Sequence, residues 1–252
     1  MKNIACFLIL VISIQLSRAD CSAHELNSYP DQGELLLNSM LIMEGYAMDQ
    51  KLIMGLEDSY LYLKDSEGFI IDLHLQEILK GQYGLTQAIF YPCKSLQLNE
   101  NYKLVYSDQN DNNIKVLGKK IGFKNFSWKA VKGKSKKIGD SELEIKFESN
   151  SFMDLGCGSA EFACFKILKD DQYIKWYRTE VVNLKTNESS SYYLKSKDAT
   201  LIVGHGMCAG AFSFEAKTCY KVQFTPVTNQ GELLESAEWI EFESPNYANN
   251  FF

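Results

Sequence analysis

Two segments of the 252-residue chain repeat one pattern, and this repeat constrains the fold more than any other feature. In the first segment Leu96 precedes Tyr102 by six positions, and in the second Phe214 precedes Tyr220 by the same distance. Each tyrosine then opens an alternating run, YKLVY in one case and YKVQF in the other. Alternation of this kind is typical of a half-buried β-strand. The repeat therefore predicts one supersecondary unit that is used twice.

Strand-sized alternating stretches fill most of the remaining chain. In the first half they are 40–46, 60–63, 69–75, 85–90, 102–106 and 114–123. In the second half they are 142–147, 160–168, 173–182, 191–194, 199–203, 219–225 and 239–243. Segment 48–56 differs, because its apolar residues have helical spacing. The sequence predicts an all-β protein with one short helix.

The composition changes to Lys, Gly and Ser between residues 124 and 139. A charged stretch without clear patterning between two alternating regions is typical of a domain boundary. We therefore predict a first domain at 20–124, a second domain at 125–245 and a C-terminal tail at 246–252. In this division segment 125–130 opens the second domain.

At the level of fold, these features resemble tandem immunoglobulin-like and fibronectin type III-like domains, as found in uncharacterised secreted proteins of bacteria. The resemblance rests on segments 96–102 and 214–220, whose spacing is similar to the tyrosine corner before strand F of such domains. It implies two tandem β-sandwiches, with the short helix in the first, and a hydrogen bond from each tyrosine hydroxyl to upstream backbone. The chain departs from the fibronectin pattern at Leu98 and Ala216, which replace a corner proline.

The N-terminus has the pattern of a secretory leader, with a positive charge, an apolar run and small residues before the expected cut. We expect residues 1–19 to be removed after Ala19, so that the mature protein is secreted, either extracellular or periplasmic. A lipid anchor on Cys21 is the weaker alternative, because Asp20 and Arg18 stand where small and aliphatic residues are needed. No later stretch approaches about 20 uninterrupted apolar residues, so we expect no transmembrane segment.

Six cysteines remain after removal of the leader: Cys21, Cys93, Cys157, Cys164, Cys208 and Cys219. In an exported protein an even number predicts disulfides rather than metal ligands. Cys21 and Cys93 share the first domain and are expected to pair. The resemblance implies Cys157 with Cys208, in loops at one end of a sandwich, and Cys164 with Cys219, on strands B and F. The local pairing, Cys157 with Cys164 and Cys208 with Cys219, stays open as the rival.

Segment 204–210 is the most unusual on the chain, since it holds three glycines, His205 and Cys208. As metal ligands or as a nucleophile with its base, these two residues need partners, and the chain has only three histidines. We interpret the segment as a tight loop in which glycine allows positive φ and Cys208 is held in a disulfide. The sequence therefore predicts no catalytic residue, no metal site and no cofactor.

Four tyrosines of the second domain are the candidate binding residues: Tyr173, Tyr177, Tyr192 and Tyr193. Amphipathic aromatic side chains on one strand face often contact a partner, and packing within the sheet is the alternative. The resemblance implies that Trp176 is buried in the core against the disulfide between strands B and F.

The sequence thus predicts a secreted, non-catalytic recognition or adhesion protein that binds an extracellular protein or glycan. The formal net charge of −6 argues against nucleic acid as a partner. One alternative is a secreted hydrolase or metal-dependent enzyme that uses His205 and neighbouring acids. Another is a structural spacer in a cell-envelope assembly.

Overall fold

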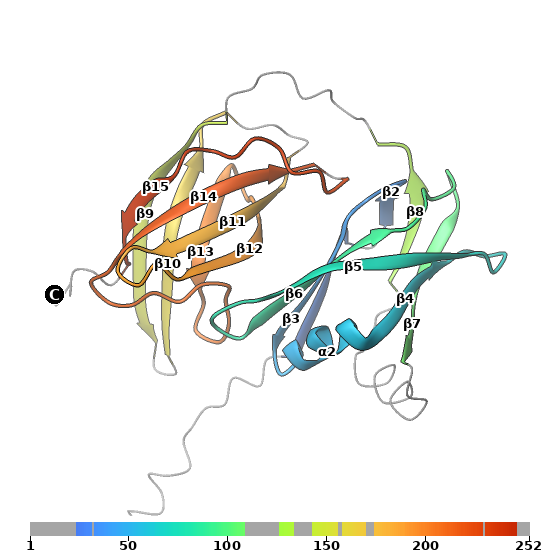
Figure 1. Cartoon of the computed structure of the whole chain (residues 1–252), viewed down its shortest axis with the longest axis horizontal. Coiled ribbons are helices and arrows are strands. Elements are labelled where there is room, and N and C mark those ends of the chain that lie inside the picture. Colours follow the sequence, from blue (N-terminus) through green and yellow to red (C-terminus); the bar gives the residue numbers. More distant parts are fainter. Residues whose placement is uncertain are drawn as a thin grey trace, which may run out of the picture.

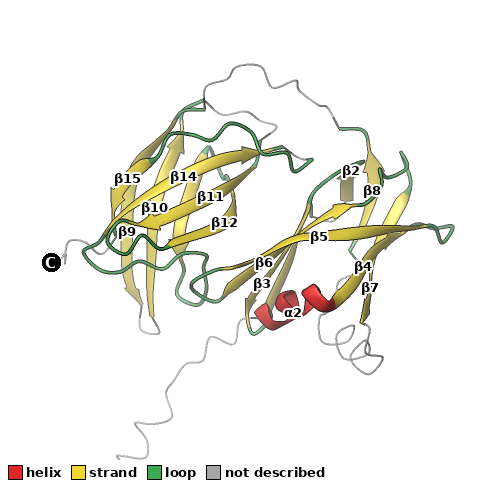
Figure 2. Ribbon diagram, viewed as in Figure 1, coloured by secondary structure: helices red, strands yellow, loops and turns green. Residues whose placement is uncertain are grey.

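The computed structural model describes residues 24–31, 33–108, 126–133, 143–155, 158–169, 174–228 and 230–245. Strands make up most of these residues, and one short helix accompanies them (Figure 2), which confirms the all-β prediction. The strands form two units that lie side by side (Figure 1). We name the described residues up to 133 the first unit and those from 143 onward the second unit. The predicted leader 1–19, the predicted strand 114–123 and the tail 246–252 lie outside the described residues.

The first unit begins with β1 (His24–Tyr29), β2 (Gly33–Leu36), β3 (Leu41–Ala47), the helix α2 (Gln50–Met54) and the 3-10 helix η1 (Gly55–Asp58). It continues with β4 (Ser59–Lys64), β5 (Ile70–Lys80), β6 (Leu85–Pro92), β7 (Asn101–Asp108) and β8 (Ser127–Val131). These strands form one sheet in the order β1-β3-β6-β5-β4-β7-β8-β2. Strands β2 and β8 pair in parallel, and the other neighbours pair antiparallel.

Strand β5 joins the two halves of this sheet. Its residues 70–72 pair with β4, whereas its residues 73–80 pair with β6. The register with β6 shifts between Leu75 and Glu77, and a bulge of this kind bends a strand and increases its twist. The two halves enclose one core, to which Phe90 contributes from one half and Trp128 from the other.

The predicted helix at 48–56 is confirmed as α2 followed by η1. Its buried residues, Ile53 and Leu56, belong to the core of the first unit. Gly45 on β3 lets the helix lie close, because a Cβ there would be 2.7 Å from Ile53 Cγ1 and 2.5 Å from the Asp49 carbonyl oxygen. The helical spacing in the sequence thus reports a true packing face.

The second unit consists, in its described part, of β9 (Ile145–Leu155), β10 (Gly158–Ile167), β11 (Trp176–Asn183), β12 (Ser189–Lys195), β13 (Thr200–His205), β14 (Cys219–Val227) and β15 (Ile240–Glu243). Two sheets form, in the orders β13-β10-β9 and β12-β11-β14-β15. Aromatic side chains join them across the core, since the ring of Phe165 on β10 lies 5.1 Å from that of Phe224 and 5.3 Å from that of Phe242. Edge-to-face pairs at such distances add to the stabilisation from burial alone.

The boundary between the units differs from the predicted one. Segment 126–133 carries β8, which pairs with β7 and β2 of the first unit. Phe126, Trp128 and Ala130 alternate inward and fill the first core. The division at 124 and 125 was therefore wrong, because the side chains that alternate after residue 125 complete the first sheet rather than open the second.

Both tyrosine corners are confirmed as hydrogen-bonded turns. The backbone N–H of Gln97 donates to the Tyr102 hydroxyl over 3.0 Å, and the N–H of Glu215 donates to the Tyr220 hydroxyl over 2.8 Å. Each tyrosine lies at the start of a strand, β7 in the first unit and β14 in the second. The repeat in the sequence thus marks the same corner in each unit.

The substitution Tyr220→Phe is expected to lower the free energy of unfolding by about 0.5 to 1.5 kcal/mol, because the Glu215 N–H loses its acceptor. Urea unfolding followed by circular dichroism measures this change. Tyr192→Phe is a matched control, since Tyr192 is also buried in the second unit but its hydroxyl has no hydrogen-bond partner. We expect Tyr192→Phe to be neutral or stabilising. Equal losses in the two variants would contradict a specific role for the corner.

The predicted disulfide between Cys164 and Cys219 is wrong, because both residues are free thiols. Cys164 alternates with the buried Ala163 and Phe165 and lies on the outer face of β10, where partial burial raises the pKa of its thiol. Cys219 likewise alternates with the buried Tyr220 and is exposed. The two side chains thus lie on the outer faces of different sheets, with the core between them.

The other predicted pairs fall partly outside the described residues. Cys93 is an exposed free thiol, so the structure does not bear out its pairing, and Cys21 lies outside the described part. Cys208 is the one described cysteine that is not a free thiol. Its predicted partner, Cys157, lies outside the described residues, and the pair of Cys157 with Cys208 stays a prediction.

Candidate functional site

The two units meet through the outer faces of two sheets. In β3 and β6 the inward side chains fill the first core, and the outward side chains Ile42 and Ile89 form a separate apolar cluster with Met40. Tyr193 of β12 and Val227 of β14 complete this cluster from the second unit. Both faces of β3 and β6 are therefore buried, and the units pack as layers of one body.

A buried glutamine connects the two sheets at this interface. The Gln87 side chain donates from Nε2 to the Tyr193 carbonyl over 2.8 Å and accepts at Oε1 from the Tyr193 N–H over 2.9 Å. Its Nε2 also donates to Glu44 Oε1 over 2.5 Å. Gln87 has no exposed surface, so one side-chain amide takes the place of a neighbouring strand for the backbone of Tyr193.

An ionic group lies next to this glutamine. Glu77 Oε2 of the first unit is 3.4 Å from the Arg178 guanidinium, and Glu77 Oε1 accepts from the Tyr193 hydroxyl over 3.1 Å. Burial, and then the nearby Glu77 carboxylate, raise the pKa of Tyr193 far above its ordinary value. Burial alone would lower the pKa of Arg178, but Glu77 outweighs it and the pKa is raised. The interface therefore keeps Tyr193 neutral and Arg178 charged.

The glycine-rich segment 204–210 forms a second contact between the units, which we name the junction. The turn between β5 and β6 pairs with it: the Gly210 N–H donates to the Tyr83 carbonyl over 2.5 Å, and the Tyr83 N–H donates to the Gly210 carbonyl over 3.2 Å. The Tyr83 ring stacks on the His205 ring with centroids 4.0 Å apart, and its hydroxyl donates to the Met207 carbonyl. The segment is thus a docking site for the first unit.

His205 is buried at this junction, with 3% of its surface exposed. Its Nδ1 lies 2.9 Å from the Gly206 carbonyl oxygen, and its Nε2 lies 3.9 Å from a carboxylate oxygen of Glu161, which is also buried. Gly204 has a φ of +140°, but it lies within β13, so the loop of this segment begins only after His205. These contacts assign His205 a place in the packing between the units.

The predicted binding tyrosines do not form an exposed surface. Tyr177 and Tyr192 are buried in the second core, and Tyr193 is buried at the interface. Tyr173 lies outside the described residues. Trp176, expected in the core, instead lies on the outer face of β11, where its ring makes an edge-to-face contact with Tyr29 of the first unit at 4.6 Å. The first unit therefore covers the outer face of β11 and β12, on which the sequence predicts an exposed contact surface.

A different sheet face remains exposed, on the side of the first unit that lies away from the second (Figure 1). In β4 the side chains of Leu61 and Leu63 enter the core, so that Tyr60 and Tyr62 lie on the outer face. Strand β5 adds Ile70 and Asp72, opposite Lys64 and Tyr62, and β7 adds Val105, opposite Tyr62. We name the set Tyr60, Tyr62, Ile70, Asp72 and Val105 the tyrosine face.

The geometry of the tyrosine face is fixed by contacts between its own side chains. The rings of Tyr60 and Tyr62 lie with centroids 5.4 Å apart and planes at 38°. The Tyr60 hydroxyl donates to the Asp72 carboxylate, and this bond raises the pKa of Tyr60. Phe69 is exposed beside Ile70 at the start of β5. Aromatic rings, aliphatic side chains and one carboxylate thus lie together on a sheet surface.

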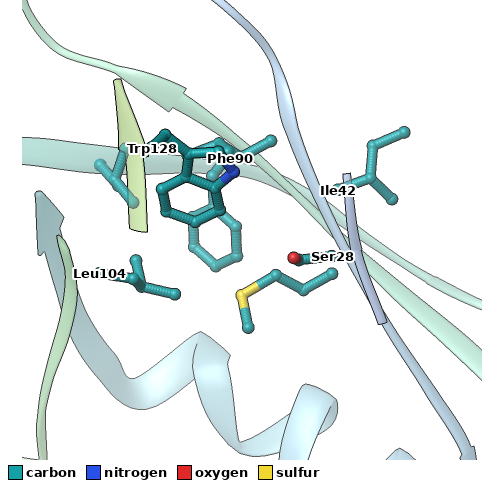
Figure 3. Close-up of a pocket in the computed structure, with 8 residues that line it drawn as sticks. Ser28, Ile42, Phe90, Leu104 and Trp128 are labelled. Carbon is teal, nitrogen blue, oxygen red and sulfur yellow. The ribbon is translucent and has the colours of Figure 1, made fainter. Parts of the chain in front are cut away.

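Two small cavities lie elsewhere in the molecule. One, of about 10 Å³, lies in the first core and is lined by Trp128, Phe90, Leu104 and Ser28 among others (Figure 3). The other, of about 80 Å³, is lined by polar groups that include Gln82 and Asn183. The first has room for about one water molecule. Both are smaller than the roughly 300 to 1,000 Å³ of ligand pockets.

Two further kinds of site have no candidate within the described part of the chain. The His, Cys, Asp and Glu residues there form no group of three or more that is arranged to hold a metal ion. Likewise, none of the helices described is both long enough and apolar enough to cross a bilayer.

No protein-family model and no curated protein sequence matches the chain. Among solved structures it is similar to a pullulanase of Anoxybacillus sp. LM18-11 complexed with maltotriose, at 11% identity and a TM-score of 0.26, over 86% of this chain and 25% of that one. A chain of a cytokine receptor complex is similar at 9% identity and a TM-score of 0.26, over 89% of this chain and 97% of that one. A two-domain fibronectin type III segment of chicken tenascin is similar at 13% identity and a TM-score of 0.24, over 88% of this chain and 98% of that one. The chain spans a quarter of the pullulanase, and at these TM-scores no likeness bears on function.

Proposed function

We propose that the chain is a secreted, non-catalytic recognition protein built from two sandwiches, an immunoglobulin-like one followed by a fibronectin type III-like one. The strand orders support this assignment. In the first unit, one sheet has the order β1-β3-β6-β5, which corresponds to strands A, B, E and D of an immunoglobulin-like domain. The other has the order β5-β4-β7-β8-β2, which corresponds to strands C′, C, F, G and A′, so that β5 contributes to both. In the second, β9-β10-β13 and β12-β11-β14-β15 correspond to A, B, E and C′, C, F, G. The two tyrosine corners before strand F agree with it.

The observation that carries the proposal is that docking of the units buries one sheet face of each and leaves the tyrosine face open to solvent. Because β5 runs from the interface to this face, the contacts at Glu77 hold the strand that presents Ile70 and Asp72. Exposed tyrosines that are held in place supply large contact areas at low entropic cost. We propose that an extracellular protein binds there, since a flat aromatic and aliphatic surface is typical of protein contacts.

The buried position of His205 supports a non-catalytic role. Its ring is stacked on Tyr83 and enclosed by the junction, so a substrate reaches it only if the two units separate. The tyrosine face has no such barrier, because Tyr60 keeps 42% of its surface exposed.

The double variant Tyr60→Ala/Tyr62→Ala tests the proposal. Labelled full-length chain is passed over surface-protein fractions of the source cells and over a glycan array, and the affinity for each captured partner is measured by surface plasmon resonance. We expect at least about tenfold weaker binding to a protein partner, because truncating central aromatic anchors commonly costs about 2 kcal/mol or more. Leu98→Ala, at a 50%-exposed position in a loop of the same unit, is the matched control and should bind normally.

Other outcomes assign other functions. Unchanged affinity in the double variant would exclude the tyrosine face as the contact. Binding to glycans alone would replace the protein partner by a carbohydrate. If the chain turned over a substrate and His205→Ala abolished this activity, the enzymatic alternative would be restored. If neither binding nor turnover were detected in any assay, the structural spacer would be favoured.

A further inference from the structure

Strand β9 is an edge strand with unusual properties. Among the described strands its sheet has the order β13-β10-β9, so β9 pairs with β10 on one side only. It runs for 11 residues, contains no proline, and lies at the rim of the second unit away from the first (Figure 1). An edge strand presents a row of backbone donors and acceptors, and proteins usually shorten, charge or cover it. The edge meets β15 where Asn150 Nδ2 donates to the Glu243 carbonyl over 2.9 Å, and its backbone groups remain suited to pairing with another strand.

Four of the nine exposed side chains of β9 are apolar, and three of these lie near its C-terminal end. Phe152, Met153 and Leu155 are all exposed, although they stand on a strand of a folded sheet. Ile202, on β13 of the same sheet, is exposed as well. Because side chains alternate along a strand, Phe152 lies on one face of β9 and Met153 and Leu155 lie on the other, and a strand paired along the edge would contact both faces.

A bulge limits which part of β9 can pair. The register with β10 shifts at Glu148, since Phe147 lies opposite Phe165 while Ser149 lies opposite Cys164. Side chains change faces at this point, and bulges terminate regular pairing. The regular part is therefore 149–155, a strand of seven residues.

We propose that a second copy of this chain pairs antiparallel with β9 along residues 149–155, about a two-fold axis at Phe152, to give one continuous six-stranded sheet. This inference does not depend on the proposed function. In this register Phe152 lies opposite Phe152 of the second copy, and Asp154 lies opposite Asn150. The Met153 residues of the two copies are diagonal neighbours, within reach of each other. The pairing therefore buries the apolar side chains and places each acid opposite an amide.

The neighbouring registers are worse, so the sequence of β9 specifies this one. An axis at Ser151 would bring Asp154 opposite Glu148, and like charges directly opposite are destabilising. An axis at Met153 would place Phe152 opposite Asp154 and shorten the paired segment. Because directly opposite residues must share a face, registers shifted by a single residue are excluded.

The substitution Phe152→Lys tests the proposal, since it places two like charges, one from each copy, opposite each other on the two-fold axis. Sedimentation velocity of the full chain over a range of concentrations, with reductant present, should show a reversible dimer for the wild type. We expect Phe152→Lys to raise the dimer dissociation constant at least about tenfold. A mixture of Phe152→Lys with Phe152→Glu should restore dimers, because opposite charges then meet. Phe152 is 47% exposed, and circular dichroism checks that each variant is folded.

Ile202→Lys is the matched control, because Ile202 is 45% exposed on the same sheet but lies on β13, which β10 separates from β9. It should leave the dissociation constant unchanged. A wild type that stays monomeric at every concentration would overturn the proposal and leave the edge to another occupant. A dimer that disappears with reductant, or one weakened equally by Ile202→Lys and Phe152→Lys, would overturn it as well.

Discussion

Alanine at Gly210 is expected to lower the free energy of unfolding by about 3 kcal/mol or more, which makes it one of the most damaging single methyl additions in the chain. The added Cβ would lie 2.2 Å from His205 Cβ and 2.3 Å from His205 Cα. These atoms belong to or adjoin the backbone, so they cannot rotate away. Relief requires the Gly210 backbone to move, and this movement breaks its two hydrogen bonds to Tyr83. The expected loss therefore combines a steric clash with the opening of the junction.

Urea unfolding measures the total loss, and hydrogen exchange at the Tyr83 and Gly210 amides reports the junction itself. Gly206→Ala is the control from the same loop, since its nearest neighbour, the Ala209 carbonyl oxygen, would lie 3.7 Å from the new Cβ in ordinary contact. That variant should stay within about 0.5 kcal/mol of the wild type. If Gly210→Ala were as stable as Gly206→Ala, the close approach at the junction would not exist in solution.

Local patterns in the sequence predicted much of each unit. Alternation identified most of the strands, helical spacing identified the helix under β3, and the spacing to Tyr102 and Tyr220 identified both corners. The turn between β4 and β5 is equally local, since the Asp65 carboxylate accepts from the backbone N–H groups of Glu67 and Phe69. These features succeed because the interactions that determine them lie within a few residues along the chain.

The packing of one unit on the other was missed, although the sequence contains a signal for it. Segment 40–43 reads Met-Leu-Ile-Met and segment 88–90 reads Ala-Ile-Phe, continuous apolar runs rather than alternations. Such runs are typical of strands buried on both faces. An interpretation as ordinary half-buried strands overlooks the second buried face. Strands β1 and β2 were missed as well, because His24–Tyr29 is polar and β2 is only four residues long.

The errors at the candidate site follow from this omission. Alternation predicts that Tyr177 and Trp176 point to opposite faces, but not which face meets the core and which meets another unit. Once the first unit covers the outer face of β11 and β12, Trp176 and Tyr193 become interface residues. Likewise, assigning Cys164 and Cys219 to strands does not show which sheet face their side chains occupy. A shift of either strand by one residue would turn the cysteine side chain from the outer face to the core. The exposed pair, Tyr60 and Tyr62, was visible as alternation with Leu61 and Leu63.

Leucine at Gln87 is expected to lower the free energy of unfolding by about 3 kcal/mol or more, because it removes two hydrogen bonds to one buried residue. The Tyr193 N–H and carbonyl would both lose the partner that Gln87 supplies. A buried backbone group left without a partner costs about 1 to 3 kcal/mol. Leucine is similar in size and fully apolar, so the loss measures hydrogen bonding rather than a cavity. Since these bonds join the two units, we also expect faster exchange of the Tyr193 amide.

Gln76→Leu is the matched control, because Gln76 is an exposed glutamine on the neighbouring strand β5. The same chemical change there should alter the free energy of unfolding by less than about 0.5 kcal/mol. Differential scanning calorimetry separates two outcomes for Gln87→Leu. A single transition at lower temperature means that the units still unfold together, whereas two transitions mean that the amide is what couples them. Stability equal to that of Gln76→Leu would show that water replaces the lost partners, and the interface would then be open rather than sealed.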